Sequence, residues 1–147
     1  MRAIILRKAD QNTQAGAALN ASNIALWIVQ IFLAVVFVLH GFLMVAPPPE
    51  LLQIINSQLG PGLRLFIGVA ELLAAAGLIL PGLTRILPVL TALAAAGLMI
   101  VMASATFFHL LRGEGGNAIT TAILFVLVTA VAYLRWKVKP IAARVKA

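Results

Sequence analysis

The chain has 147 residues, of which 63% are hydrophobic and 10% are charged, and its mean hydropathy is +1.08. A soluble domain has about a quarter of its residues charged and about half of them apolar, so this composition predicts an integral membrane protein with no room for a soluble catalytic domain. The absence of cysteine excludes disulfides, thiolate metal sites and thiol redox chemistry carried by the chain itself.

Basic residues outnumber acidic ones, eleven to four, but their placement argues against a nucleic-acid partner. Eight of them lie before the first apolar run or after the last, namely Arg2, Arg7, Lys8, Arg135, Lys137, Lys139, Arg144 and Lys146. Basic residues that flank membrane spans set the orientation of the spans and attract anionic lipid. We therefore predict no binding to nucleic acid.

The first 45 residues divide into a polar arm and a first span. Residues 1–23 mix charges with Gln, Asn and Thr; this arm carries no packing signal, and its composition allows disorder. Residues 24–45 run for 22 residues without a charge, which is long enough to cross about 30 Å of hydrocarbon. This run is longer than the apolar core of a signal peptide and has bulky residues throughout, so we interpret it as a retained span.

A connector with a short helix follows the first span. The three prolines at 47–49 stop the span, because proline lacks the backbone N–H and clashes with the preceding turn. Pro49 and Glu50 then begin a new helix well, with proline in the first turn and an acid at the positive end of the helix dipole. Its apolar residues fall on one face: Leu51, Leu52, Ile55 and Leu59. We predict a short amphipathic helix at the membrane interface, between spans one and two.

Three more apolar runs complete the predicted fold, which is all-α: an integral membrane four-helix bundle. They are the second, third and fourth spans, over residues 63–83, 86–111 and 117–135. We interpret Pro81 and Gly82 as the end of the second span, and the glycine-rich residues 113–116 as the turn after the third.

The positive charges also predict how the bundle is oriented. Nine of the eleven basic residues lie on the side that holds the N-terminal arm, the turn at Arg85 and the residues from Arg135 onward. Only Arg64 and Arg112 lie on the other side, where we interpret them as interface anchors. Because Lys and Arg are enriched in cytoplasmic loops, both termini are predicted to be cytoplasmic, with residues 136–147 as a basic cytoplasmic tail.

Glu71 is the clearest pointer to a site, because it is the only acidic residue inside any of the four apolar runs. A charged carboxylate there costs about 2.5–3.5 kcal/mol, so it has to face protein or water, be paired, or be protonated. The alternating direction of the spans places Glu71 in the outer half of the membrane, together with polar residues of the other three spans. The candidate ligand-binding or proton-relay residues are Glu71, His109, His40, Asn117, Thr106 and Arg112.

Each candidate also has a purely structural interpretation. Asn117 is placed as the N-cap of the fourth span, and Thr106 is placed to bond the backbone of its own helix. Gln30 is the one strongly polar residue of the inner half. No catalytic residue is assigned, and no metal site is predicted because the spacing of the histidines and the carboxylate matches no metal motif.

Two blocks of sequence resemble a known family. The first is residues 66–84, which contain Gly68-Val69-Ala70-Glu71-Leu72 and later Pro81-Gly82, and the second is residues 105–114, which contain Phe108-His109-Leu110-Leu111-Arg112-Gly113-Glu114 and lead to Asn117. Over about residues 27–140 this pattern resembles the DoxX-like family of small four-helix bacterial membrane proteins. The resemblance implies that Glu71, His109 and Asn117 are recurrent polar positions, and that the protein is a multi-pass protein of the bacterial inner (cytoplasmic) membrane.

Three functions stay open at this point. Relatives in the family include a membrane subunit of a thiosulfate:quinone oxidoreductase, which implies a subunit of a redox complex with Glu71, His109 and His40 around an outer-leaflet pocket for a quinone. The chain has no redox centre of its own, so it is at most a subunit of an oxidoreductase. The alternatives are an assembly or scaffold protein without its own chemistry, and a small transporter or proton pathway, against which the apolar inner half weighs. The expected partners are the lipid bilayer and the proteins of a membrane complex or a second copy of the chain.

Overall fold

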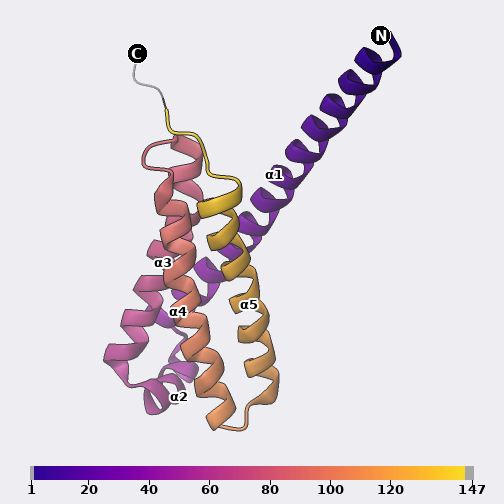
Figure 1. Ribbon diagram of the computed structural model, residues 1–147. Coiled ribbons are helices and arrows are strands. Elements are labelled where there is room, and N and C mark those ends of the chain that lie inside the picture. The colour runs from indigo at the N-terminus through magenta and orange to yellow at the C-terminus, as the bar shows by residue number, and fades with distance from the viewer. Residues whose placement is uncertain (1, 145–147) are drawn as a thin grey trace.

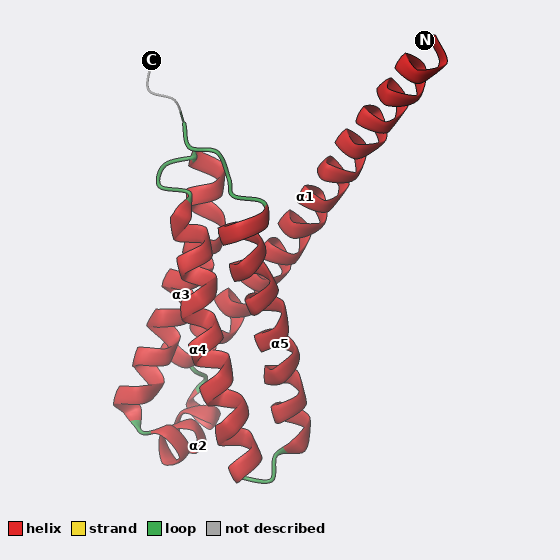
Figure 2. Cartoon of the chain, in the orientation of Figure 1, coloured by secondary structure: helices red, strands yellow, loops and turns green. Residues whose placement is uncertain are grey.

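The computed structural model describes residues 2–144, and their side chains from Asn20 onward. These residues form helices and no strand, joined by short loops (Figures 1 and 2). The elements are α1 (Arg2–Val45), α2 (Pro49–Leu59), α3 (Pro61–Thr84), α4 (Val89–Leu111), α5 (Gly115–Tyr133) and a single π-helical turn, η1 (Leu134–Val138). The prediction of an all-α fold is confirmed.

Four helical segments are long and apolar enough to cross a membrane. They are the second part of α1 (Asn20–Val45), α3, α4, and α5 continued by η1 (Gly115–Val138). Large apolar side chains are exposed on each of them, for example Leu39, Phe66, Ile100 and Ile119. A surface of this kind is stable against lipid and not against water. The molecule is therefore a multi-pass membrane protein, as predicted.

The four segments pack in the order of the chain. α1 packs against α3, α3 against α4 and α4 against α5, and contacts between α1 and α5 close the bundle. The α3–α4 turn and the C-terminal residues lie at one end, where the first part of α1 projects away from the bundle, and α2 and the α4–α5 turn lie at the other (Figure 1). We call the end with Arg85 and Lys139 the tail end, and the end with α2 and Glu114 the α2 end. The cytoplasmic placement of the tail end and the interfacial placement of α2 stay predictions.

The middle of the bundle is a hydrophobic core. Its buried residues come from all four segments: Leu33, Ala34, Phe37, Ala75, Leu78, Ala95, Leu98, Met102, Val128 and Val131. Alanines on α3 and α4 let the helix backbones approach closely, which is how helices gain packing energy in lipid. This core separates the polar side chains of the tail end from those of the α2 end.

Three helix boundaries differ from the predicted ones. The polar arm does not precede the first helix but belongs to it, since α1 is helical from Arg2. Pro81 does not end the second span; it lies inside α3, which continues to Thr84. α4 begins at Val89 and not at residue 86. Leu87 has a positive φ of 48° and so cannot belong to a right-handed helix, and Pro88, which follows it, is the N-cap of α4.

Candidate functional site

The site begins with a close crossing of α1 and α3. A Cβ atom on Gly68 would lie 2.9 Å from the carbonyl oxygen of Gly41, and one on Gly41 would lie 2.9 Å from the carbonyl oxygen of Gly68. Real Cβ atoms essentially never come that close to another atom. Only glycine at both positions lets the two backbones touch, and this contact fixes the depth and rotation of the residues on either side.

His40, next to this crossing on α1, faces Glu71, one turn further along α3. His40 Nδ1 and Glu71 Oε2 are 2.6 Å apart and share a hydrogen bond. A bond this short is typical of a charge-assisted pair. The Glu71 side chain is fully buried, whereas the His40 side chain is 48% exposed. The carboxyl group thus orients an imidazole ring that is about half exposed on the surface of the bundle.

The second oxygen of Glu71, Oε1, is buried and has no hydrogen-bond partner among the described residues. The bond between Oε2 and Nδ1 requires one proton, held on either atom. With that proton on Nδ1, the outer nitrogen of His40, Nε2, can accept a hydrogen bond or take up a second proton. The pair can therefore bind a polar group that arrives from the membrane, and it can hold and pass on a proton.

Arg64 supports the crossing from the α2 end. Arg64 is only 7% exposed, so it points into the bundle, and its interpretation as an interface anchor leaves out the bonds that it makes there. Its Nη1 donates to the carbonyl oxygens of Met44 and Val45, and its Nε donates to Asn56 Oδ1 at 2.9 Å. The prolines after α1 end the helix and leave its last carbonyls without backbone donors. Arg64 satisfies two of them and ties α1, α2 and α3 together.

A second polar group surrounds Glu114 in the α4–α5 turn. Glu114 Oε2 is 2.6 Å from His109 Nδ1 and accepts a bond from Asn117 Nδ2 at 3.3 Å, and Oε1 accepts from Arg112 Nε at 2.7 Å. The prediction that Asn117 is the N-cap of the fourth span is wrong, because α5 begins at Gly115 and Glu114 occupies the cap position. Glu114, which was not among the predicted site residues, is the centre of this group.

The predicted site residues thus fall into separate groups toward the α2 end. His40 pairs with Glu71, and His109 pairs with Glu114. Thr106 belongs to neither pair, since its hydroxyl bonds the carbonyl of Met102 and the hydroxyl of Thr121 and so links α4 to α5. Among the described residues no hydrogen bond or ion pair connects the two histidine–carboxylate pairs. A single pocket lined by both histidines stays a prediction.

A third polar network lies beyond the hydrophobic core, at the tail end. Gln30 is fully buried; its amide donates to the carbonyl of Leu78 at 2.7 Å and its oxygen accepts from Arg135 Nε at 2.7 Å. Arg135 Nη1 also donates to Asn23 Oδ1 at 2.7 Å. The sequence singled out Gln30 as the polar residue of the inner half, but it placed Arg135 at the membrane interface. The structure buries Arg135 between α1 and the end of α5.

The Glu114 group predicts a pH dependence of the α4–α5 turn. Hydrogen bonds from Arg112, His109 and Asn117 lower the pKa of Glu114 from its ordinary value of 4.5 to about 2. A carboxyl group with a lowered pKa stabilises the folded state fully above pH 4.5, and this contribution is lost as the pH falls toward about 2.

We expect backbone amide exchange in the turn, corrected for its intrinsic pH dependence, to accelerate several-fold over that interval, while the core of α4 around Leu98 stays protected. The measurement is hydrogen–deuterium exchange in nanodiscs. Glu114→Gln should abolish the pH dependence, and an unchanged profile in that variant would show that Glu114 is not the titrating group.

Four apolar helices in a closed bundle, with a buried carboxyl group that holds a half-exposed imidazole, define a small multi-pass helical membrane protein. The model of the DoxX-like family matches residues 28–131, most of the chain, so the chain belongs to the DoxX-like family. This confirms the resemblance found in the sequence. The matched region contains both histidine–carboxylate pairs and ends before Arg135. Comparisons with curated proteins and with solved structures give no match.

Proposed function

We propose that the protein is the membrane subunit of a redox complex and that the His40–Glu71 pair binds the head group of a quinone. One observation carries this proposal: a fully buried carboxyl group holds an imidazole that is half-exposed on the lipid-facing surface. A ligand dissolved in the bilayer can reach Nε2 of His40 without crossing the bundle. Basic residues gathered at the tail end support a bacterial inner-membrane location with that end in the cytoplasm.

The chemistry of the pair suits a quinone. Quinone carbonyls accept hydrogen bonds, and reduction of the head group takes up protons as well as electrons. With the shared proton on Glu71 Oε2, Nε2 of His40 carries a hydrogen that it can donate to a quinone carbonyl. As Nε2 gives up this proton, Glu71 passes its own proton to Nδ1, so the imidazole stays neutral and Glu71 becomes a carboxylate. Neither side chain is a redox centre, so the electrons come from a partner protein or from a cofactor that the partner binds.

An apolar groove on the same two helices adds support. It has a volume of about 300 Å³ and is lined only by aliphatic side chains: Ile31, Ala34, Val35, Val38, Leu39 and Ile79. The groove reaches Leu39, which directly precedes His40 in the chain. An isoprenoid tail is the part of a quinone that such a groove would bind.

A proton pathway through the bundle receives less support. His40 and Gln30 are ten residues apart on α1, a distance of about 15 Å along the helix axis. Between these levels the bundle is filled by fully buried apolar side chains, including Leu33, Phe37 and Leu78. Such a layer contains no group that could pass a proton from one polar network to the other.

The test is the binding of a short-chain ubiquinone to the purified protein in nanodiscs. Glu71→Gln and His40→Phe are each expected to weaken binding by about tenfold or more, the loss of a charge-assisted hydrogen bond worth about 1.5–3 kcal/mol. Glutamine can still bond His40 but cannot hold the shared proton, and phenylalanine has no ring nitrogen. His109→Phe is the matched control, since His109 is held by Glu114, and it should leave quinone affinity unchanged. Wild-type affinity in folded His40→Phe would reject the quinone site and favour the scaffold function.

A further inference from the structure

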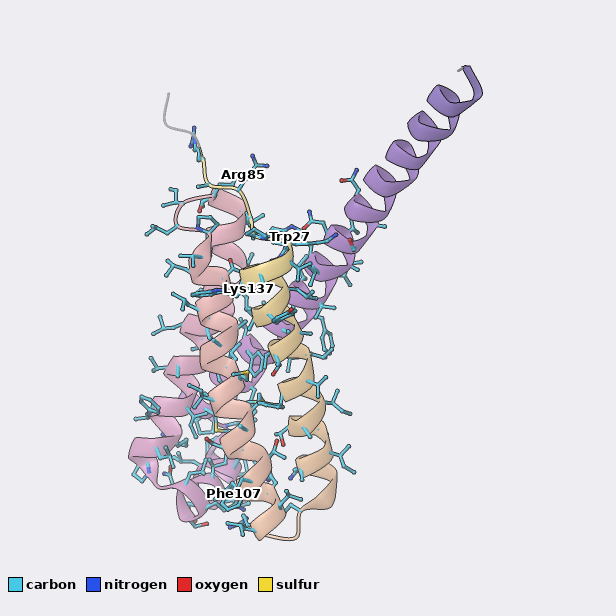
Figure 3. All side chains as sticks on the ribbon, in the orientation of Figure 1. Trp27, Arg85, Phe107 and Lys137 are labelled. Carbon is cyan, nitrogen blue, oxygen red and sulfur yellow. The ribbon has the colours of Figure 1, made fainter. Side chains whose placement is uncertain are left out.

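A polar pocket opens at the tail end, on the other side of the hydrophobic core from the His40–Glu71 pair. It has a volume of about 400 Å³ and lies between α1, the end of α3 and the residues around and after η1. Its lining residues include Asn23, Trp27, Arg85, Arg135 and Lys139. Figure 3 shows Trp27 and Arg85 near this end, far from Phe107 at the α2 end.

The pocket contains a buried guanidinium group with an unused donor. The Arg135 side chain is only 5% exposed, and its Nη2 has no hydrogen-bond partner among the described residues. Its other nitrogens are occupied: Nε bonds Gln30, and Nη1 bonds Asn23 and the carbonyl of Lys139. The guanidinium also lies 5.5 Å from the centre of the Trp27 ring, which helps to fix its plane. Arg135 is thus held in place with one edge unsatisfied.

The charges around the pocket are of one sign. Three of its lining residues are cationic, Arg85, Arg135 and Lys139, and none is acidic. The acidic residues whose side chains the structure describes lie elsewhere: Glu71 and Glu114 belong to the groups described above, and Glu50 lies in α2. No described carboxylate therefore neutralises the pocket. A fixed guanidinium, further cations and side-chain amides are the groups that bind phosphate in proteins.

We propose that this tail-end pocket is a binding site for a phosphate group. The pocket lies where the membrane-spanning segments end, at the level where phospholipid headgroups lie. The phosphate of an anionic phospholipid can enter there with its acyl chains still in the bilayer. Free inorganic phosphate has the same recognition chemistry, and the experiment below distinguishes the two sources.

Trp27 provides the readout, because its ring contacts the guanidinium that would bind the phosphate. The chain has two tryptophans, and Trp136 is exposed and does not line the pocket. In the full-length Trp136→Phe protein, purified in detergent, Trp27 is the only tryptophan. We expect a saturable change in its fluorescence on titration with short-chain phosphatidylglycerol. Saturation by inorganic phosphate at a similar concentration would instead identify free phosphate as the ligand; either result supports a phosphate site.

Two further variants separate a built site from general charge attraction. Arg85→Asn removes one pocket cation and is expected to weaken binding about fivefold or more, the loss of one charge-assisted hydrogen bond. Asparagine is chosen because residue 85 has a left-handed backbone, φ 57°, which asparagine tolerates. Lys137→Gln removes an exposed cation that does not line the pocket and should leave the affinity unchanged. Equal losses in these two variants, or no saturable Trp27 signal with either ligand, would overturn the proposal.

The proposed phosphate site and the proposed quinone site can be tested independently. They lie at opposite ends of the bundle, and the variants that test one leave the other intact. Arg135→Gln is expected to abolish phosphate binding, but it also removes bonds to Gln30 and Asn23, so its folding has to be checked first. The Arg85 side chain makes no hydrogen bond or ion pair with the residues that the structure describes, so Arg85→Asn keeps the test decisive if Arg135→Gln does not fold.

Discussion

Replacing Gly68 by valine is expected to destabilise the bundle by about 3 kcal/mol, the upper end of the usual cost of overpacking. The new Cβ would lie 2.8 Å from Met44 Cβ and from Val45 Cγ2, and 2.9 Å from the carbonyl oxygen of Gly41. Side chains can move aside, but the Gly41 carbonyl belongs to the backbone of α1, so α1 has to move away from α3. The measurement is the free energy of unfolding in mixed micelles of increasing SDS content.

Gly97→Val is the matched control for this prediction. Gly97 lies in the middle of α4, and a Cβ there would meet nothing within 4 Å. Valine at that position should change the free energy of unfolding by less than about 0.5 kcal/mol, because it removes only the intrinsic cost of glycine in a helix. Comparable destabilisation in the two variants would mean that the close contact of α1 and α3 does not limit stability.

The Gly68→Val protein should also lose quinone binding, even where it stays folded. His40 and Glu71 meet only because the two backbones touch beside them, and a shift of α1 would lengthen the 2.6 Å bond that joins them. A separated imidazole would be left without an orienting carboxyl group. Full quinone affinity in a variant whose helices have moved apart would show that the pair is not the binding group.

Arg64→Met is expected to cost about 2–4 kcal/mol. The substitution keeps an apolar stem but leaves the carbonyls of Met44 and Val45 and the side-chain oxygen of Asn56 without their donor. An unsatisfied buried polar group costs about 1–3 kcal/mol, and these groups cannot all turn to water. Because the lost bonds hold α2 to the rest of the bundle, amide exchange in α2 should accelerate as well.

Arg112→Met tests whether the effect of Arg64→Met comes from burial. Arg112 lies at the same end of the bundle and bonds the Glu114 carboxylate, but it is exposed. Exposed ion pairs contribute about 0–1 kcal/mol, so this variant should unfold nearly as the wild type does. A loss at Arg112 as large as that at Arg64 would contradict the role assigned to the buried guanidinium.

Glutamate 71 illustrates how far the sequence alone leads to the site. A single acid inside an apolar run has to be buried and partnered, and the structure does bury it. Its partner could not be chosen from the sequence, because position along a span gives depth but not rotation about the helix axis. His40 and His109 were both within reach in depth. Only the crossing at Gly41 and Gly68 decides that His40 is the partner.

Arg64, Arg135 and Glu114 were misjudged or missed for one common reason. Charged residues near span ends usually lie at the membrane surface. Arg64 was therefore interpreted as an interface anchor, and Arg135 as a basic residue that flanks the last span. Their burial depends on acceptors that are distant in the chain: the carbonyls at the end of α1 for Arg64, and Gln30 and Asn23 for Arg135. Glu114 lies in a glycine-rich turn, where a carboxylate is ordinary in sequence. Only the structure shows that His109 and Asn117 bond it.

Hydropathy by itself determined that this chain crosses the membrane four times, because a helix of about twenty apolar residues is stable in hydrocarbon whatever its neighbours are. It also determined that an acidic side chain lies inside the bundle, through the cost of exposing it to lipid at the position of Glu71. The tertiary structure decided which polar side chains meet, where the spans touch and which cations are buried. Those outcomes depend on helix rotation and on close backbone contact, which are properties of packed pairs of helices and not of any one segment.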